Sequence, residues 1–244
     1  RILRLAAFVD SIGGTMATVV PRDLPLVDLL SKASSADLNI LADLITDNEK
    51  GRVALDSKVK ITIWNHRAKG SLRSISDVLE AEIRAFGSNS IANMFRSSGV
   101  SYVELATDVA KKLDGKPSAS HDIFDVEEIV MRQALSQIKG VKTYSSHAEL
   151  LNQVAQVVKA LVSSAGKFGG IAATGGVAAA SGAIGGRLLS LIPPLAVVGA
   201  GVTIYQATSP AFRITVPAVL QIARIRRIRY EADFAAYQEE LRSC

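Results

Sequence analysis

The chain has 244 residues, of which 48% are hydrophobic but only 5% aromatic, and its formal net charge is +5. Its length allows one large domain or two small ones. The apolar residues are mostly Ala, Val, Leu and Ile, which favours an all-α protein whose helices pack through small side chains. The single cysteine, Cys244, excludes an intrachain disulfide and a cysteine-based metal site within one chain.

The N-terminal residues 1–12 mix arginines with apolar side chains, and Asp10 interrupts the apolar run. No clear small-residue cleavage site follows. We therefore expect an amphipathic helix here rather than a signal peptide.

Residues up to about 160 predict short amphipathic helices, most of them opened by a polar cap. A Ser or Asp that accepts from a backbone N–H three residues later, often beside an acidic side chain, is typical of a helix N-terminus. The predicted caps are Ser34 with Asp37, Ser101 with Glu104, Asp122 or Asp125, and Ser146 with Glu149.

One stretch is ambiguous, because Val59, Ile61 and Ile63 alternate with more polar residues at the period of a strand. No second alternating run offers a pairing partner, so we predict helix or irregular structure there. The stretch Lys112–Ser120 contains Gly and Pro and is the best predicted linker. Residues 71–76 form a second, weaker joint.

The sequence predicts two parts. Residues 1–145 form a helical body that is mildly acidic. Residues 146–244 form a helix, a glycine-rich apolar hairpin over residues 166–212, and a basic C-terminal helix.

The second part has an unusual charge pattern, because no Asp or Glu occurs from Leu150 to Tyr230. A surface that faces water normally carries both signs of charge. An apolar segment that ends in arginines is instead typical of contact with an anionic bilayer. The cations of this stretch are Lys159, Lys167, Arg187, Arg213, Arg224, Arg226, Arg227 and Arg229.

Two uncharged runs, Phe168–Gly186 and Leu188–Phe212, flank Arg187. Each reaches the roughly 20 residues that a helix needs to cross hydrocarbon, but Gly and Ala gain little on transfer. We therefore expect conditional insertion or a close-packed hairpin. The residues predicted to contact the membrane are Phe168, Ile171, Ile184, Leu188, Leu189, Leu191, Ile192, Leu195, Val197, Val198 and Ile204.

Small residues recur at every fourth position through this segment, which on a helix would form a groove that a second helix can approach closely. The residues predicted to pack helices in this way are Gly166, Gly170, Ala178, Gly182 and Gly186. A hairpin buried in a soluble core and a glycine-rich loop remain open as alternatives.

The residues Ala218–Tyr230 predict a basic amphipathic helix. We expect anionic lipid or a partner to bind Arg187, Arg213, Arg224, Arg226, Arg227 and Arg229. Nucleic acid is not expected, because the aromatic residues typical of single-strand binding are nearly absent. The alternative is an interior helix whose arginines pair with Glu231, Asp233, Glu239 and Glu240.

No residue pattern predicts catalysis, a cofactor or a metal site. The histidines His66, His121 and His147 lack a metal-ligand spacing. His121 and Asp122 lie directly after the predicted linker, where a helix cap is the simpler interpretation. The pair Glu127 and Glu128 is most simply read as the solvated first turn of a helix.

Three stretches resemble the bacterial YaaW-like family. They are Asp28–Gly51, especially ADLNILADLITDNEKG (Ala36–Gly51), then EIRAFGSNSIANMF (Glu82–Phe95, followed by SYVELATDVAKKL) and FRITVPAVLQIARIRR (Phe212–Arg227). The family is grouped with chaperone-like proteins for ubiquinol-cytochrome c reductase assembly. The resemblance implies an all-helical body with a role near membranes or nascent membrane proteins, and it carries no catalytic residues over.

Together these features predict a non-enzymatic protein in the cytoplasm that associates with the inner membrane, with a pore-forming or membrane-perturbing role for the 166–212 hairpin. A homo-oligomer is compatible with this function. The alternative is a soluble chaperone or adaptor that binds apolar helices of membrane-protein clients. A small enzyme with an unrecognised site is a third possibility.

Overall fold

The computed structural model describes residues 22–46, 55–88, 100–137, 144–168 and 212–243. Apart from one short 3-10 helix, the regular structure in these ranges is α-helical, so the fold is all-α as predicted. The elements are α2 (Leu26–Lys32), α3 (Ser35–Thr46), α4 (Ser57–Ala68), η1 (Leu72–Ile75), α5 (Ser76–Ser88), α6 (Tyr102–Lys112), α7 (Ile123–Ser136), α8 (His147–Phe168) and α11 (Phe212–Ser243).

The predicted caps open four of these helices. Ser101 and Glu104 form a complete capping box at α6. The Asp122 carboxylate accepts from the backbone N–H of Asp125 at 2.8 Å at the start of α7. Ser34 does the same for Asp37, and Ser146 for Glu149. The ambiguous stretch around Ile61 is helical within α4, because α4 has its own cap at Asp56.

The predicted linker Lys112–Ser120 is a tight connection between two packed helices, not a joint between domains. Helices α6 and α7 pack against each other on either side of it. Asp114 adopts a positive φ of 65° and the N–H of Gly115 donates to the carbonyl of Ala110 at 2.8 Å, which ends α6 with a reversal of the chain. The segment therefore closes a helical hairpin.

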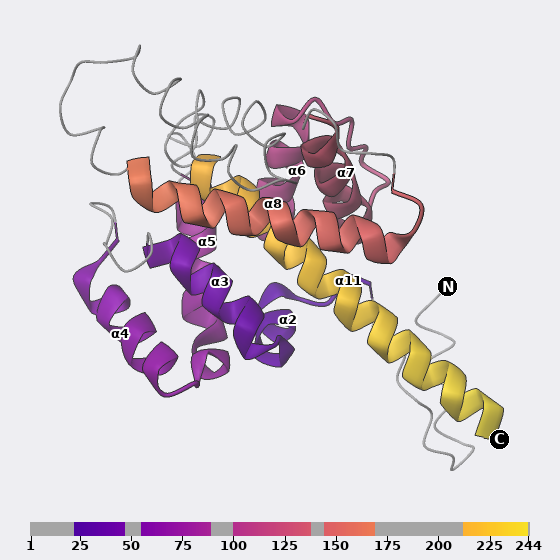
Figure 1. Ribbon diagram of the computed structural model, residues 1–244, viewed down its shortest axis with the longest axis horizontal. Helices are drawn as coiled ribbons and strands as arrows, with labels where there is room; N and C mark the ends of the chain where they lie inside the picture. The colour runs from indigo at the N-terminus through magenta and orange to yellow at the C-terminus, as the bar shows by residue number, and fades with distance from the viewer. Residues whose placement is uncertain (1–21, 47–54, 89–99, 138–143, 169–211, 244) are drawn as a thin grey trace.

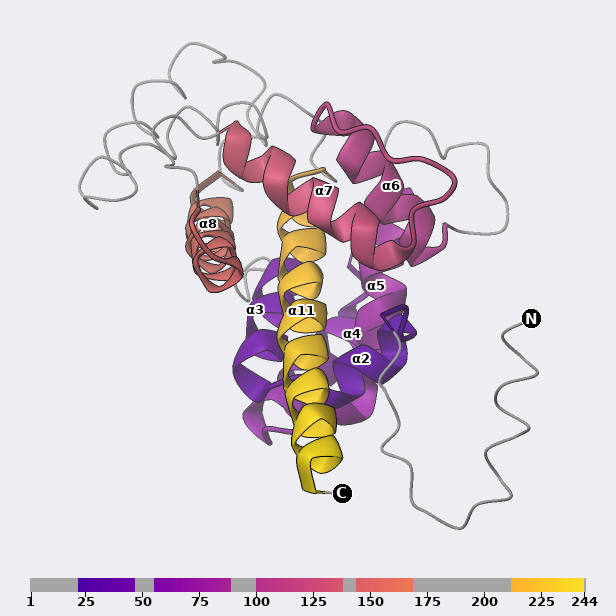
Figure 2. The ribbon, with the colours of Figure 1, turned by 90° about the vertical axis from the view of Figure 1, so that its right-hand side faces the viewer.

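Helix α11 passes through the centre of the body, where it contacts α3, α5, α6, α7 and α8. Figure 2 shows α8 on one side of α11 and α6 on the other, with α7 crossing near the start of α11. From Ile214 to Arg227 only Arg224 is not buried. The helix begins at Phe212, and Pro217 lies inside it.

The two predicted parts share one hydrophobic core. It includes Leu41 and Ile45 of α3, Val130 of α7, Val154 of α8 and Leu220 of α11. The boundary near residue 145 therefore does not separate two cores among the described residues. Beyond Arg227, α11 leaves the body and projects away from it as a single helix (Figure 1).

Candidate functional site

The arginines of α11 were the main predicted ligand-binding residues, and the structure places them in two different environments. Arg224, Arg226 and Arg227 lie on the part of the helix that the core surrounds. A buried charge is costly unless it is paired and hydrogen-bonded. The acidic partners come from α3 and α7, which are remote in sequence.

Arg226 is the most deeply buried of these cations, with 3% of its surface exposed. Its Nε donates to Oε2 of Glu127 at 2.9 Å, and its Nη1 donates to the carbonyl of Leu24 at 2.6 Å. The hydroxyl of Tyr102 donates to the other carboxylate oxygen of Glu127 at 2.8 Å. One carboxylate thus joins α6, α7 and α11, and the same guanidinium holds the chain just before α2.

Burial also shifts the acid–base properties of this cluster. It raises the pKa of the Glu127 carboxyl, while the charges of Arg226 and Arg227 and the bond from Tyr102 act in the opposite direction. Burial, followed by the charge of Glu127, raises the pKa of the Tyr102 hydroxyl well above its usual value. The phenol therefore stays protonated and serves as a hydrogen-bond donor.

Arg227 lies on the neighbouring face and combines three interactions. Its Nη2 is 3.0 Å from Oε2 of Glu128 and donates to the carbonyl of Phe124 at 2.7 Å. Its guanidinium carbon lies 3.3 Å from the centroid of the Phe124 ring, which is a cation–π contact. Burial lowers the pKa of this guanidinium, and the charges of Glu128 and Glu127 oppose the shift.

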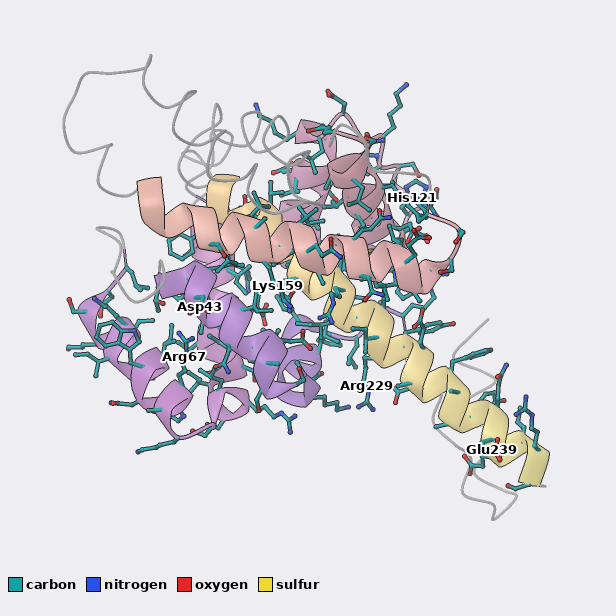
Figure 3. The ribbon with its side chains drawn as sticks, in the orientation of Figure 1. Asp43, Arg67, His121, Lys159, Arg229 and Glu239 are labelled. Carbon is teal, nitrogen blue, oxygen red and sulfur yellow. The ribbon has the colours of Figure 1, made fainter. Side chains whose placement is uncertain are left out.

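Arg224 faces the other side of the body. Its Nη1 and the Nε2 of Gln221 lie 2.5 Å and 2.8 Å from the same Oδ1 of Asp37 on α3. Arg229, at the point where α11 leaves the body, pairs with Asp233 on the same helix at 2.5 Å. Figure 3 shows Arg229 at this transition, and Glu239 near the far end of the helix.

These positions correct part of the sequence interpretation. In this fold Arg226 and Arg227 do not reach lipid headgroups or an external partner, because their charges are satisfied inside the protein. The alternative prediction, an interior helix whose arginines pair with acids, agrees better with the structure. Of the acids predicted as partners for these arginines, however, only Asp233 is used, in its pair with Arg229. Glu127 was read as solvated, whereas it is fully buried.

Sequence reasoning missed Tyr102, Phe124 and Glu127 as partners of the arginines. A signal was present for Glu127, because it lies four residues after Ile123 and three before Val130, on the apolar face of α7. A carboxylate on such a face requires a buried cation. No sequence feature indicated which arginine would supply it.

Most of the residues predicted to contact the membrane or to pack helices lie outside the described part of the chain. Gly166 and Phe168 fall in the last turns of α8, and Arg213 falls in the first turn of α11. The other membrane-contact and helix-packing residues, and Arg187, lie outside the described residues. Among the helices that are described, none is long and apolar enough to cross a membrane.

The polar residues of the described part form no site that binds a metal: no group of three or more His, Cys, Asp or Glu side chains gathers there. A hollow of about 530 Å³ lies between α3 and α4 and is lined by Asn39, Trp64, Arg67 and Ala68. Arg67 is bound to Asp43 at 2.6 Å across the two helices (Figure 3). This pair links the two helices and balances the charge of Arg67 at the edge of the hollow.

Comparison with known proteins supports the family resemblance. The UPF0174 protein YaaW of Escherichia coli K12 is 29% identical over 226 residues, which cover 83% of this chain and 93% of the relative. The UPF0174 protein of Helicobacter pylori strain J99 is 24% identical over 245 residues, covering 89% of this chain and 96% of that protein.

No family model matches the chain. No solved structure matches it either. The YaaW match extends over most of both chains. These matches support the resemblance of the chain to the bacterial YaaW-like, or UPF0174, family.

Proposed function

We propose that this protein is a non-enzymatic, membrane-associating helical protein. The described helices form a body that holds both ends of the apolar segment at residues 169–211, and that segment contacts an anionic bilayer. One observation carries the proposal. The two helices that border the segment, α8 and α11, pack against each other in the core.

The packing of α8 and α11 brings the two ends of the segment to the same region of the body. In Figures 1 and 2 the last turns of α8 and the first turns of α11 lie at the same end of the molecule. Both helices are anchored by buried apolar side chains, such as Val154 and Val158 of α8 and Val216 and Val219 of α11. Such a base favours a hairpin that leaves and returns at one place.

The absence of Asp and Glu from Leu150 to Tyr230 has two different explanations in different parts of the stretch. The buried faces of α8 and of the first half of α11 carry no acids, and α3 and α7 supply the partners of the arginines. Residues 169–211 contain only Arg187 as a charge. The lipid interpretation rests on this shorter segment, whose composition suits a small-residue helix interface in a bilayer.

Flotation of the full-length chain with liposomes tests the proposal. We expect it to float with phosphatidylcholine vesicles that contain phosphatidylglycerol, and less with phosphatidylcholine alone. The double variant Leu191→Lys/Leu195→Lys should lower the floating fraction, because lysine is costly inside hydrocarbon. The matched control is Ile61→Lys, which adds a lysine at a body position that is 53% exposed.

Failure of the wild-type chain to float with either vesicle would refute membrane association. Equal flotation of the Leu191/Leu195 variant and the wild type would refute the assignment to residues 169–211. The adaptor alternative predicts a third pattern, in which a membrane-protein client co-purifies and no lipid binds.

A further inference from the structure

The part of α11 beyond the body, residues 228–243, is called the C-terminal arm below. Every residue from Tyr230 to Ser243 is exposed or half-buried, in contrast to the buried stretch before it. Figures 1 and 3 show the arm leading away from the other described helices. A lone helix of this length is marginal in water without a packing partner.

The arm carries an apolar stripe along one face. Tyr230, Phe234, Tyr237 and Leu241 follow one another at spacings of four, three and four residues, which is the repeat of a helix that pairs with another helix. Phe234 is 45% exposed and Leu241 57% exposed. These are large side chains to leave in water, and together they form one surface.

The stripe continues an aromatic cluster that begins in the body. The ring of Phe124 meets that of Tyr230 edge-on at 5.0 Å between centroids, and Tyr230 stacks on Phe234 at 6.2 Å. Arg22 and Arg227 both cover Phe124. The base of the arm is therefore fixed, so the stripe is held in one orientation relative to the body.

Both edges of the stripe carry acids. The helical repeat places Asp233 and Glu240 along one edge, and Glu231 along the other with Gln238. Arg229 pairs with Asp233, Arg242 pairs with Glu239 on the far face, and Nε2 of His147 on α8 lies 3.6 Å from Oε1 of Glu231. With four acids against Arg242, residues 230–243 keep an acidic excess. In helix pairs, charges at these edge positions select the partner.

The edge charges argue against a second copy of the arm as occupant. In an antiparallel pair, Asp233 of one copy would face Glu240 of the other, which places like charges together. In a parallel pair, Asp233 would face Gln238, and Glu231 would face Arg226, which is already buried against Glu127. Neither arrangement gains an opposite charge.

We propose that the C-terminal arm is a docking helix for an amphipathic partner helix whose apolar face is bordered by Lys or Arg. The stripe provides the apolar contact, and Glu231, Asp233 and Glu240 provide the charge complementarity. This inference does not depend on membrane association by residues 169–211.

A pair of designed peptides tests the docking surface with the full-length protein. Both are three-heptad helices with Leu at the core positions; one carries Lys at the edge positions and the other carries Glu. Fluorescence anisotropy should show that the Lys peptide binds at least about ten-fold more tightly than the Glu peptide. The variant Phe234→Ala/Leu241→Ala should lose this binding, whereas Ile61→Ala, at an exposed position on α4, should keep it.

A charge reversal provides the second measurement. The variant Glu231→Lys/Glu240→Lys should bind the Glu peptide more tightly than the Lys peptide. The wild-type chain has a net positive charge, so a nonspecific attraction would not explain its preference for the Lys peptide. The proposal is overturned if the full-length protein binds neither peptide, if it binds both equally, or if it forms a dimer that Phe234→Ala abolishes. Vesicle flotation of the uncharged variant Phe234→Ala/Leu241→Ala should match the wild type, so the two proposals fail separately.

Discussion

Arg226 of α11 and Glu127 of α7 form an ion pair at 2.9 Å in which the two side chains are 3% and 0% exposed. The residues are far apart in sequence, and their pairing fixes the central helix against α7. Removing one partner of such a pair leaves an uncompensated charge, whereas replacing both with apolar residues removes the charge altogether. The pair therefore makes a specific prediction about stability.

We expect Arg226→Met to lower the free energy of unfolding by about 3–5 kcal/mol, because Glu127 would remain buried without its cation. The double variant Arg226→Met/Glu127→Met should recover much of this loss. Urea unfolding followed by circular dichroism measures both. Arg242→Met is the matched control, because its pair with Glu239 is largely exposed, and it should cost no more than about 1 kcal/mol. A double variant as unstable as the single one would contradict the argument.

The sequence predicted the helical class and the caps correctly because both depend on local patterns. Ser101 and Glu104 are three residues apart, so their capping box could be read directly from the sequence. The same holds for the cap at Asp122. The YaaW-like resemblance was also readable, because it rests on contiguous stretches.

The arginine cluster could not be predicted in the same way. The basic pattern of Ala218–Tyr230 is the same whether its arginines face lipid or buried acids, and only tertiary packing decides between them. The partners Glu127 and Asp37 lie on other helices, and α11 contacts both of these helices. A buried helix with several arginines is uncommon, which is why a surface role was the simpler prediction.

The turn after α6 gives a test of close packing. A Cβ placed on Gly115 would lie 2.5 Å from Cγ2 of Ile129 and 2.8 Å from the carbonyl oxygen of Ala110. Because backbone must shift to relieve the second contact, we expect Gly115→Ala to destabilise the protein by about 1–3 kcal/mol.

Gly70 is the comparison position for Gly115. An added Cβ on Gly70 would have no atom within 4 Å, but the φ of Gly70 is +66°. Gly70→Ala should cost about 1–2 kcal/mol from backbone strain alone. Asn tolerates this conformation, so Gly70→Asn should cost less than Gly70→Ala, whereas Gly115→Asn should cost more than Gly115→Ala. Thermal unfolding of the four variants checks this order, and the opposite order at Gly115 would show that the turn can rearrange.

The exposed pair Arg22–Asp125 predicts a pH dependence. Slight burial acts to raise the pKa of the Asp125 carboxyl, but the hydrogen bond and charge of Arg22 outweigh it and lower the pKa below its usual 3.8. A lowered folded-state pKa gives stability that is present above the unfolded-state pKa and is lost as the pH falls through the folded-state value.

We therefore expect wild type to be more stable than Asp125→Asn at pH 7, by no more than about 1 kcal/mol because both side chains are partly exposed. The difference should shrink below pH 3.8. Urea unfolding of both proteins across this range measures it. A difference that grows on acidification would have the wrong sign for this pairing.

The last prediction concerns Arg187, the single charge in the apolar segment at residues 169–211. If this residue lies at the turn of a hairpin that contacts anionic lipid, Arg187→Glu should reduce flotation with phosphatidylglycerol vesicles, because an attraction becomes a repulsion of about the same size, roughly 1 kcal/mol per charge. Arg226→Lys serves as the control. It keeps a positive charge inside the body, where that charge is paired with Glu127, so flotation should be unchanged. Release of a trapped dye from the same vesicles would separate pore formation from surface binding. Undiminished flotation of Arg187→Glu would place the lipid contact elsewhere in the chain.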